Sequence, residues 1–142
     1  MFTGEYRHAV DGKGRIAVPA RFRGQLADGA VVARWLDSCL AIFPMTAWSE
    51  LAARVGSLPM TDPNARLLQR QLFSGALETE LDGQGRVLVP QGLREFAGLE
   101  AEALVLGSRD HAEIWAPSRW TDYSRSLDDP DAFARAIAGL GI

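Results

Sequence analysis

The chain has 142 residues, of which 47% are hydrophobic and 23% charged, and its formal net charge is −3. These values are typical of one globular domain and exclude a disordered chain. No apolar run approaches the roughly 18 residues that a membrane crossing needs, and the polar residues around Glu5 argue against a signal peptide. The single cysteine excludes a disulfide framework, and two histidines leave little for a metal site. We therefore expect a soluble cytoplasmic protein without metal or cofactor.

Positive charge is concentrated near the N-terminus. Residues 1–26 contain five basic and two acidic side chains, whereas the remainder of the chain is acidic. A basic end on an acidic body indicates an anionic partner, and charge merely scattered over the surface is the alternative. The five basic residues are Arg7, Lys13, Arg15, Arg21 and Arg23.

The first expected element is a hairpin, with strands at 5–10 and 15–18 around an Asp-Gly-Lys-Gly turn. Pro19 ends its second strand. A short helix, a second hairpin and a longer helix capped by Thr46 should follow. They are expected at residues 20–26, at 31–36 with 40–43, and at 46–54.

The middle of the chain predicts an ordered helix that begins at Asp62-Pro63, because aspartate followed by proline is typical of a helix start. Beyond it we expect strands, a helix that ends at Gly98, two more strands, and a helix from Ser118. The first two strands are expected at 76–81 and 86–89, the helix that ends at Gly98 at 91–97, and the two further strands at 103–107 and 112–115. A last helix should begin at Asp129-Pro130 and stop at Gly139.

The chain contains an internal repeat. Residues 10–19 read VDGKGRIAVP and residues 81–90 read LDGQGRVLVP. One copy is too small to bury an adequate core, so the two copies should close against each other. We expect a mainly β, α+β fold, a pseudo-two-fold β barrel with peripheral helices. The proposed division is a first unit at 1–54, a helical linker at 55–75, a second unit at 76–125 and a C-terminal helix at 126–142.

Each repeat places an aspartate and an arginine across its turn. An aspartate in such a loop accepts backbone N–H bonds two residues on, and the arginine can meet the same carboxylate in a two-pronged contact. The glycines between them supply backbone angles with positive φ. The motif can brace the loop, and it can also present cations to a phosphate or a base edge. Its members are Asp11, Gly12, Gly14 and Arg15, repeated as Asp82, Gly83, Gly85 and Arg86.

The opening Met-Phe-x-Gly-x-Tyr, the doubled Asp-Gly-x-Gly-Arg and the following Pro-x-x-Phe/Leu-Arg resemble the MraZ family. That resemblance implies a bacterial transcriptional regulator from the division and cell-wall gene cluster, built from two AbrB-like swapped-hairpin units. It further implies rings that bind short direct repeats of double-stranded DNA upstream of their own operon, and hence a nucleoid-associated protein.

On that resemblance, we expect the first turn to enter the major groove of DNA. Lys13 and Arg15 would read guanine acceptors, while Arg7, Arg21 or Arg23 hold phosphates. The second turn has Gln84 in place of Lys13 and lies in an acidic stretch, so it should be the poorer contact. Arg86 can be a second reader or the structural brace of a subunit contact, and we expect it to share the two roles. No membrane or small-molecule partner is expected.

Other functions are less well supported by the sequence. Ser108 with Asp110-His111 suggests a hydrolase, but sequence neighbours on a strand point to opposite faces, and no nucleophile-elbow pattern surrounds the serine. Cys39 with His8 suggests a thiol pair, although a buried lone cysteine is the better interpretation. Gly12-Lys13-Gly14 lacks the spacing of a phosphate loop, and the calcium-loop ligands are missing. The protein is therefore not expected to be an enzyme.

An antitoxin-like or other interaction module remains the alternative, because swapped-hairpin units also occur in antitoxins. Those usually hold one copy and a disordered tail, whereas this chain holds two copies and a helical C-terminus. Several apolar residues could belong either to the core or to subunit contacts, with the core favoured. They are Trp35, Leu36, Trp115 and Trp120.

Overall fold

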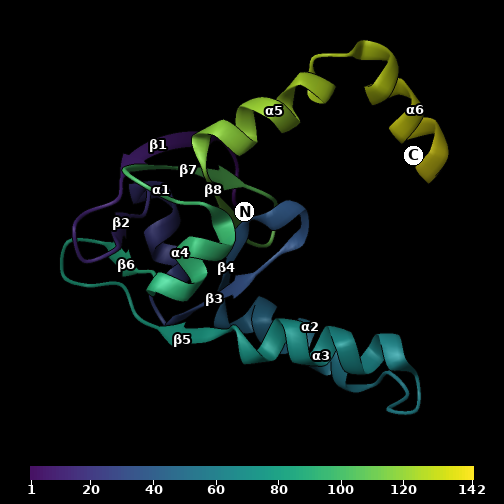
Figure 1. Ribbon diagram of the computed structural model, residues 1–142, viewed down its shortest axis with the longest axis horizontal. Helices are drawn as coiled ribbons and strands as arrows, with labels where there is room; N and C mark the ends of the chain where they lie inside the picture. Colours follow the sequence, from purple (N-terminus) through teal and green to yellow (C-terminus); the bar gives the residue numbers. More distant parts are fainter.

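Eight strands form a six-stranded sheet and a separate two-stranded ladder in the computed structural model, which describes residues 1–142 (Figure 1). The sheet order is β1-β7-β8-β4-β3-β5, the ladder is β2-β6, and every pairing is antiparallel. The strands are β1 (Glu5–Ala9), β2 (Arg15–Ala17), β3 (Ala30–Arg34), β4 (Leu40–Pro44), β5 (Leu77–Thr79), β6 (Arg86–Leu88), β7 (Glu102–Gly107) and β8 (Ala112–Trp115).

Helices connect the strands and extend the chain beyond them. Proline occupies the first helical position of α3, α5 and α6, where its missing N–H costs nothing. The helices are α1 (Ala20–Arg23), α2 (Met45–Gly56), α3 (Pro63–Ser74), α4 (Gln91–Ala97), α5 (Pro117–Leu127) and α6 (Pro130–Leu140), with 3₁₀ turns η1 (Gly24–Leu26) and η2 (Leu36–Ser38). None of them combines the length and apolar character that crossing a membrane requires.

The two halves of the chain exchange strands. β1 of the first half pairs with β7 of the second, and β5 of the second half pairs with β3 of the first. The ladder also joins the halves, because β2 pairs with β6. The first expected hairpin is therefore wrong as a strand pair. Its turn forms, but apart from the single Val10–Ile16 bridge its strands find their partners in the other repeat.

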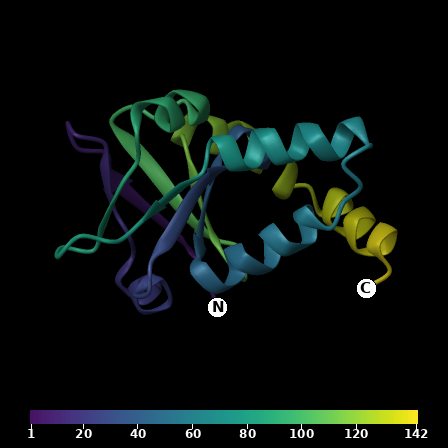
Figure 2. The ribbon, with the colours of Figure 1, turned by 90° about the horizontal axis from the view of Figure 1, so that it is seen from below.

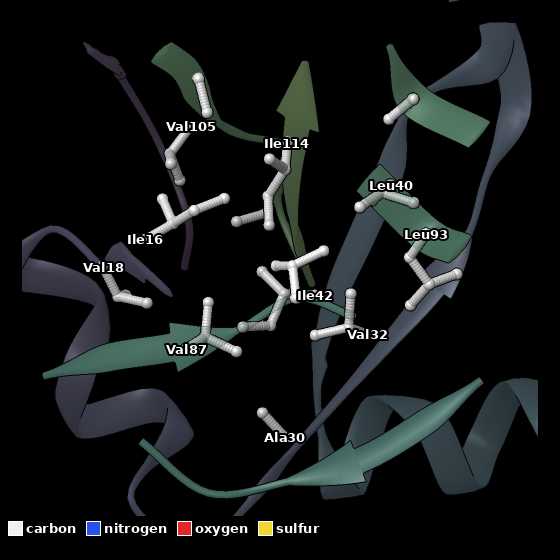
Figure 3. Packing of buried hydrophobic residues seen from close by; sticks show 14 of the residues in the cluster. Ile16, Val18, Ala30, Val32, Leu40, Ile42, Val87, Leu93, Val105 and Ile114 are labelled. Atoms are coloured by element: carbon white, nitrogen blue, oxygen red, sulfur yellow. The ribbon is translucent and has the colours of Figure 1, made fainter. Parts of the chain in front are cut away.

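The ladder covers one face of the sheet, and the main core lies between them. Ile16 and Val87 of the ladder are fully buried and point toward sheet residues such as Ile42, Val105 and Ile114 (Figure 3). Alternate residues of a strand face opposite sides, so each sheet strand also contributes to a second layer of packing. Residues from both repeats meet in this one core.

Helices cover the other face of the sheet. Val31 and Phe43 pack with Trp48 of α2 and Leu72 of α3, and Trp115 packs with Trp120 of α5. Figure 2 shows α2 and α3 as a pair that is spread apart next to the sheet and extends beyond it to the loop that joins the two helices. Cys39 is buried beside Trp115, which confirms its expected role as a core residue.

The α+β class is confirmed, but two expectations about the architecture need correction. Helices hold more residues than strands, so the fold is not mainly β. No closed barrel of strands is found, because β1 and β5 form open edges of the sheet and the ladder stands apart from it. The ladder strands are only three residues long and reach across the sheet face through side chains instead.

Most helix ends lie where the sequence predicts them. Asp62 caps α3 by accepting a hydrogen bond from the Asn64 N–H at 2.8 Å, and Gly98 ends α4 in the left-handed conformation. Thr46 does not cap α2, because the helix begins one residue earlier, after Pro44. The last helix continues through Gly139 and ends at Gly141, whose positive φ closes it.

Candidate nucleic-acid interface

The first turn is tied together by one carboxylate. Asp11 Oδ1 accepts hydrogen bonds from the backbone N–H groups of Lys13, at 3.0 Å, and Arg15, at 2.8 Å. Asp11 Oδ2 accepts a third from Arg15 Nε at 2.6 Å. Only one prong of the contact therefore comes from the guanidinium, and the terminal nitrogens of Arg15 make no hydrogen bond within the chain.

The second turn repeats this geometry. Asp82 accepts from the backbone N–H groups of Gln84 and Arg86, both at 2.9 Å, and from Arg86 Nε at 2.8 Å. A terminal nitrogen of Arg86 also lies 3.7 Å from Asp11 Oδ2. Asp11 therefore faces both arginines, and the two motifs meet side by side where β2 and β6 pair.

Hydrogen bonding keeps both aspartates ionised. The backbone N–H of Arg15 is the main cause that lowers the pKa of Asp11, to about 2, and partial burial opposes it. The backbone N–H of Arg86 likewise lowers the pKa of Asp82. Both turns therefore hold a full negative charge at the base of the loop near neutral pH, and each arginine is oriented by it.

Each turn is supported by an arginine from the other repeat. Gly14 has φ of +85°, and a Cβ built on it would lie 2.7 Å from the Val89 carbonyl oxygen and 2.8 Å from Arg94 Nε. Gly85 has φ of +72°, and a Cβ there would overlap the Arg23 side chain. The chain can approach so closely only because these positions lack a side chain.

The cations expected to touch DNA are not all equally free. Lys13 is exposed at the tip of the first turn, and Arg21 is exposed on α1 and donates to the Tyr6 hydroxyl at 3.1 Å. Arg7 is exposed on β1 but forms an ion pair with Glu102. Arg23 lies against the second turn and donates from Nε to the Val18 carbonyl at 2.9 Å.

Figures 1 and 2 both show the two turns at one end of the molecule, away from the α2–α3 pair and α6. The two turn motifs, predicted from spacing alone, are thus brought together. The arginine that supports the first turn was not singled out by the sequence reasoning. Arg94 matches Arg23 in the repeat alignment and ends the second Pro-x-x-Phe/Leu-Arg motif, and these two signals could have pointed to it.

The alternative site around His111 has a different geometry from the expected one. Asp110 and His111 do not face opposite ways: His111 Nδ1 lies 2.7 Å from Asp110 Oδ1, because Asp110 precedes β8 in a turn where Arg109 has φ of 68°. The link between Ser108 and His111 is a backbone hydrogen bond. Burial lowers the pKa of His111, but hydrogen bonds to Glu113 and Asp110 outweigh it and leave that pKa raised.

The four ambiguous apolar residues separate by exposure. Trp115 is buried and belongs to the core, and Trp35 and Trp120 pack against that core with part of their surface open. Leu36 is 71% exposed and is not a core residue. Burial also raises the pKa of the Cys39 thiol, which is therefore protonated near neutral pH.

Comparison with known proteins identifies the family. The sequence model described as "MraZ protein, putative antitoxin-like" matches residues 1–71 and again residues 72–138. A protein named "Transcriptional regulator MraZ" from Roseiflexus sp. (strain RS-1) is 50% identical over 99% of both chains. Proteins of the same name from Moorella thermoacetica and Desulfitobacterium hafniense (strain Y51) are 48% and 46% identical over 100% of both chains. The doubled turn motif, its crosswise support and these full-length matches together show that the chain belongs to the MraZ family.

Proposed function

We propose that this protein is a sequence-specific DNA-binding regulator of transcription that acts through its first turn. The observation that carries the proposal is the turn itself: Lys13 stands exposed at its tip, and Asp11 holds the loop and orients Arg15. A stiff loop loses little conformational entropy on binding. The names of the full-length relatives, all transcriptional regulators, support the same role.

The chemistry of the turn fits a base edge in the major groove. Arginine and lysine donate to the O6 and N7 acceptors of guanine, and the major groove admits a two-stranded β ribbon. Because Asp11 occupies only Nε of Arg15, its terminal nitrogens are available to donate. Arg21, and Arg7 once it leaves Glu102, would hold phosphates.

The second turn should contribute less to DNA affinity. Its tip carries Gln84 instead of a lysine, and Glu78, Glu80 and Asp82 lie close to it in the chain. Negative charge repels phosphate. Arg86 lies 3.7 Å from Asp11, so its main role is to complete the charged contact between the two turns. Arg23 supports the second turn rather than a phosphate.

One turn makes too few contacts to select an operator, since a good bidentate contact discriminates by only about 1–3 kcal/mol. Several copies assembled in a ring, on direct repeats spaced by about 10 bp, would multiply that preference. The repeats would lie upstream of the protein's own operon in the division and cell-wall gene cluster. The strand exchange between the halves supports two swapped-hairpin units, near 1–54 and 76–125, in a nucleoid-associated cytoplasmic protein.

An antitoxin-like interaction module is the second candidate, and the words "antitoxin-like" in the family description favour it. The two repeats share one core here, and the C-terminal segment is helical. A dimer that binds a partner protein and ignores DNA repeats would support this candidate over the first.

The test is binding of fluorescent DNA from the native upstream region, compared with DNA whose repeats are scrambled, at two salt concentrations. We expect the native DNA to bind more tightly at both. Arg15→Ala should remove the difference between the two DNAs, because it removes the guanine donor. Arg125→Ala, which deletes an arginine that is 76% exposed on α5, is the matched control and should keep it.

Equal affinity of the wild-type protein for native and scrambled DNA would refute sequence-specific binding. An Arg15→Ala protein that still prefers the native DNA would show that the first turn does not read bases.

A further inference from the structure

Helix α6 presents an apolar face that nothing in the chain covers. Phe133, Ile137 and Leu140 are spaced so that they share one side of the helix, and they are 67%, 37% and 77% exposed. The helix has no buried residue. Figure 1 shows it at the far end of α5, away from the sheet and from the α2–α3 pair. An amphipathic helix gains stability only when its apolar side is buried, so α6 needs a partner.

A groove on the α2–α3 pair, separate from α6, has the matching character. It lies between α2, α3 and the end of β3, has a volume of about 270 Å³, and six of its eight lining residues are hydrophobic. Leu36 and Leu68 line it and are 71% and 43% exposed. Bulky apolar side chains that remain open around a hollow are typical of a contact surface.

The charges around the two surfaces are complementary. Asp128, Asp129 and Asp131 lie at the start of α6, against one arginine within it. Helix α3, one wall of the groove, carries two arginines and no acidic residue, and Arg34 lines the groove itself. Arg34 donates a 3.5 Å hydrogen bond to Gln71 and lies over the Phe96 ring, but it forms no ion pair, so no acidic side chain neutralises its charge within the chain. An acidic amphipathic helix therefore suits a basic-edged apolar groove.

We propose that α6 of one copy docks in the α2–α3 groove of the next copy. A two-residue junction, Asp128 and Asp129, holds α6 at the end of α5, clear of its own groove in Figure 1, so the helix is offered to a neighbour. Because helix and groove are different patches, the contact runs head to tail and builds a ring or a chain of copies. The inference builds on the multi-copy assembly in the proposed function and names its contact surfaces.

The experiment measures particle size by analytical ultracentrifugation without DNA. The wild-type protein should form assemblies larger than a dimer at micromolar concentration. Phe133→Asp removes the helix face and Leu68→Asp removes the groove, and each should weaken assembly at least about tenfold. Ala138→Asp, on the exposed opposite face of α6, is the control and should assemble like the wild type. If Leu68→Asp unfolds, Leu36→Asp tests the groove at a more exposed residue.

A mixture of the two defective proteins gives the decisive result. The Phe133→Asp copy keeps its groove and the Leu68→Asp copy keeps its helix, so together they should form a dimer with one intact contact. A mixture that stays monomeric, or single variants that assemble like the wild type, would overturn the proposal. Because DNA is absent, this outcome is separate from the DNA-binding test: assembly can fail while the first turn still selects bases, and the reverse.

Discussion

Asp11 links the two repeats through a single side chain. Its carboxylate accepts three hydrogen bonds in its own turn and lies 3.7 Å from Arg86 of the other. An ionised carboxylate can only accept hydrogen bonds, so both of its oxygens are free for these donors, whereas a protonated carboxyl group would carry an O–H donor of its own. The residue therefore couples the shape of the first turn to its charge.

Asp11→Asn keeps the size of the side chain and removes the charge, so its effect on stability should depend on pH. Hydrogen bonds hold the folded pKa at about 2, below the ordinary value of 3.8. The ionised group therefore stabilises the protein fully above pH 4, and this contribution is lost as pH falls toward 2, because the unfolded chain takes up the proton first.

We expect the variant to unfold at lower urea concentration than the wild type near pH 6, and the two midpoints to converge as pH is lowered from 4 toward 2. A difference that stays constant from pH 6 to pH 2 would contradict the role given to the charge.

The spacing of residues in the sequence predicts contacts within one turn, but not contacts between the two repeats. The contact between Asp11 and Arg15 spans four residues, so the turn sequence alone determines it. The contacts of Arg23 with the second turn and Arg94 with the first connect residues far apart in the chain. They depend on which strands pair, which no local pattern records.

The first turn and helix α4 form a single supported unit. The backbone of Gly14 lies against Arg94 of α4, and the Val89 N–H donates to the Gly14 carbonyl at 2.9 Å. The turn is thus held by contacts with Val89 and Arg94 of the second repeat and by the hydrogen bonds that Asp11 accepts within the turn. The surface of the first turn that we propose to contact DNA therefore depends on elements of both repeats.

Gly14→Ala should lower the free energy of unfolding by at least about 1 kcal/mol, since an alanine in the left-handed conformation is strained. The added methyl would also press on Val89 and Arg94. Gly12→Ala, two residues away, meets no atom within 4 Å and should stay within about 0.5 kcal/mol of the wild type.

Urea unfolding of the two variants at pH 7 measures both effects. Equal stabilities for the two alanine variants would show that the support from α4 does not constrain the turn.

The positions of strands and helices were easier to predict than the pairing of the strands. The strands around 15–18 and 86–89 and the helix start at Asp62 follow from turn residues and caps. Their pairing does not, because a strand that alternates apolar and polar residues fits either its neighbour or a strand of the other repeat. The strand exchange and the absence of a closed barrel result from this freedom.

The whole molecule has two ends with different chemistry. One end carries both turns, of which only the first has a lysine at its tip, and the other carries the α2–α3 pair and α6 (Figures 1 and 2). Copies joined head to tail through the second end would present a row of first turns. The two turns share a backbone geometry and differ in charge, so the second turn is a control for the effect of charge in the first.

The most direct measurement compares DNA binding of Lys13→Glu with that of Gln84→Glu. Both side chains are exposed at a turn tip, and in both turns the aspartate holds the backbone N–H rather than the side chain, so neither change should disturb the fold. We predict that Lys13→Glu weakens binding to the native upstream DNA at least about tenfold, through phosphate repulsion and the lost base contact, whereas Gln84→Glu stays close to the wild type. Equal losses in the two variants, or full affinity with Lys13→Glu, would contradict the claim that the first turn is the DNA-reading element.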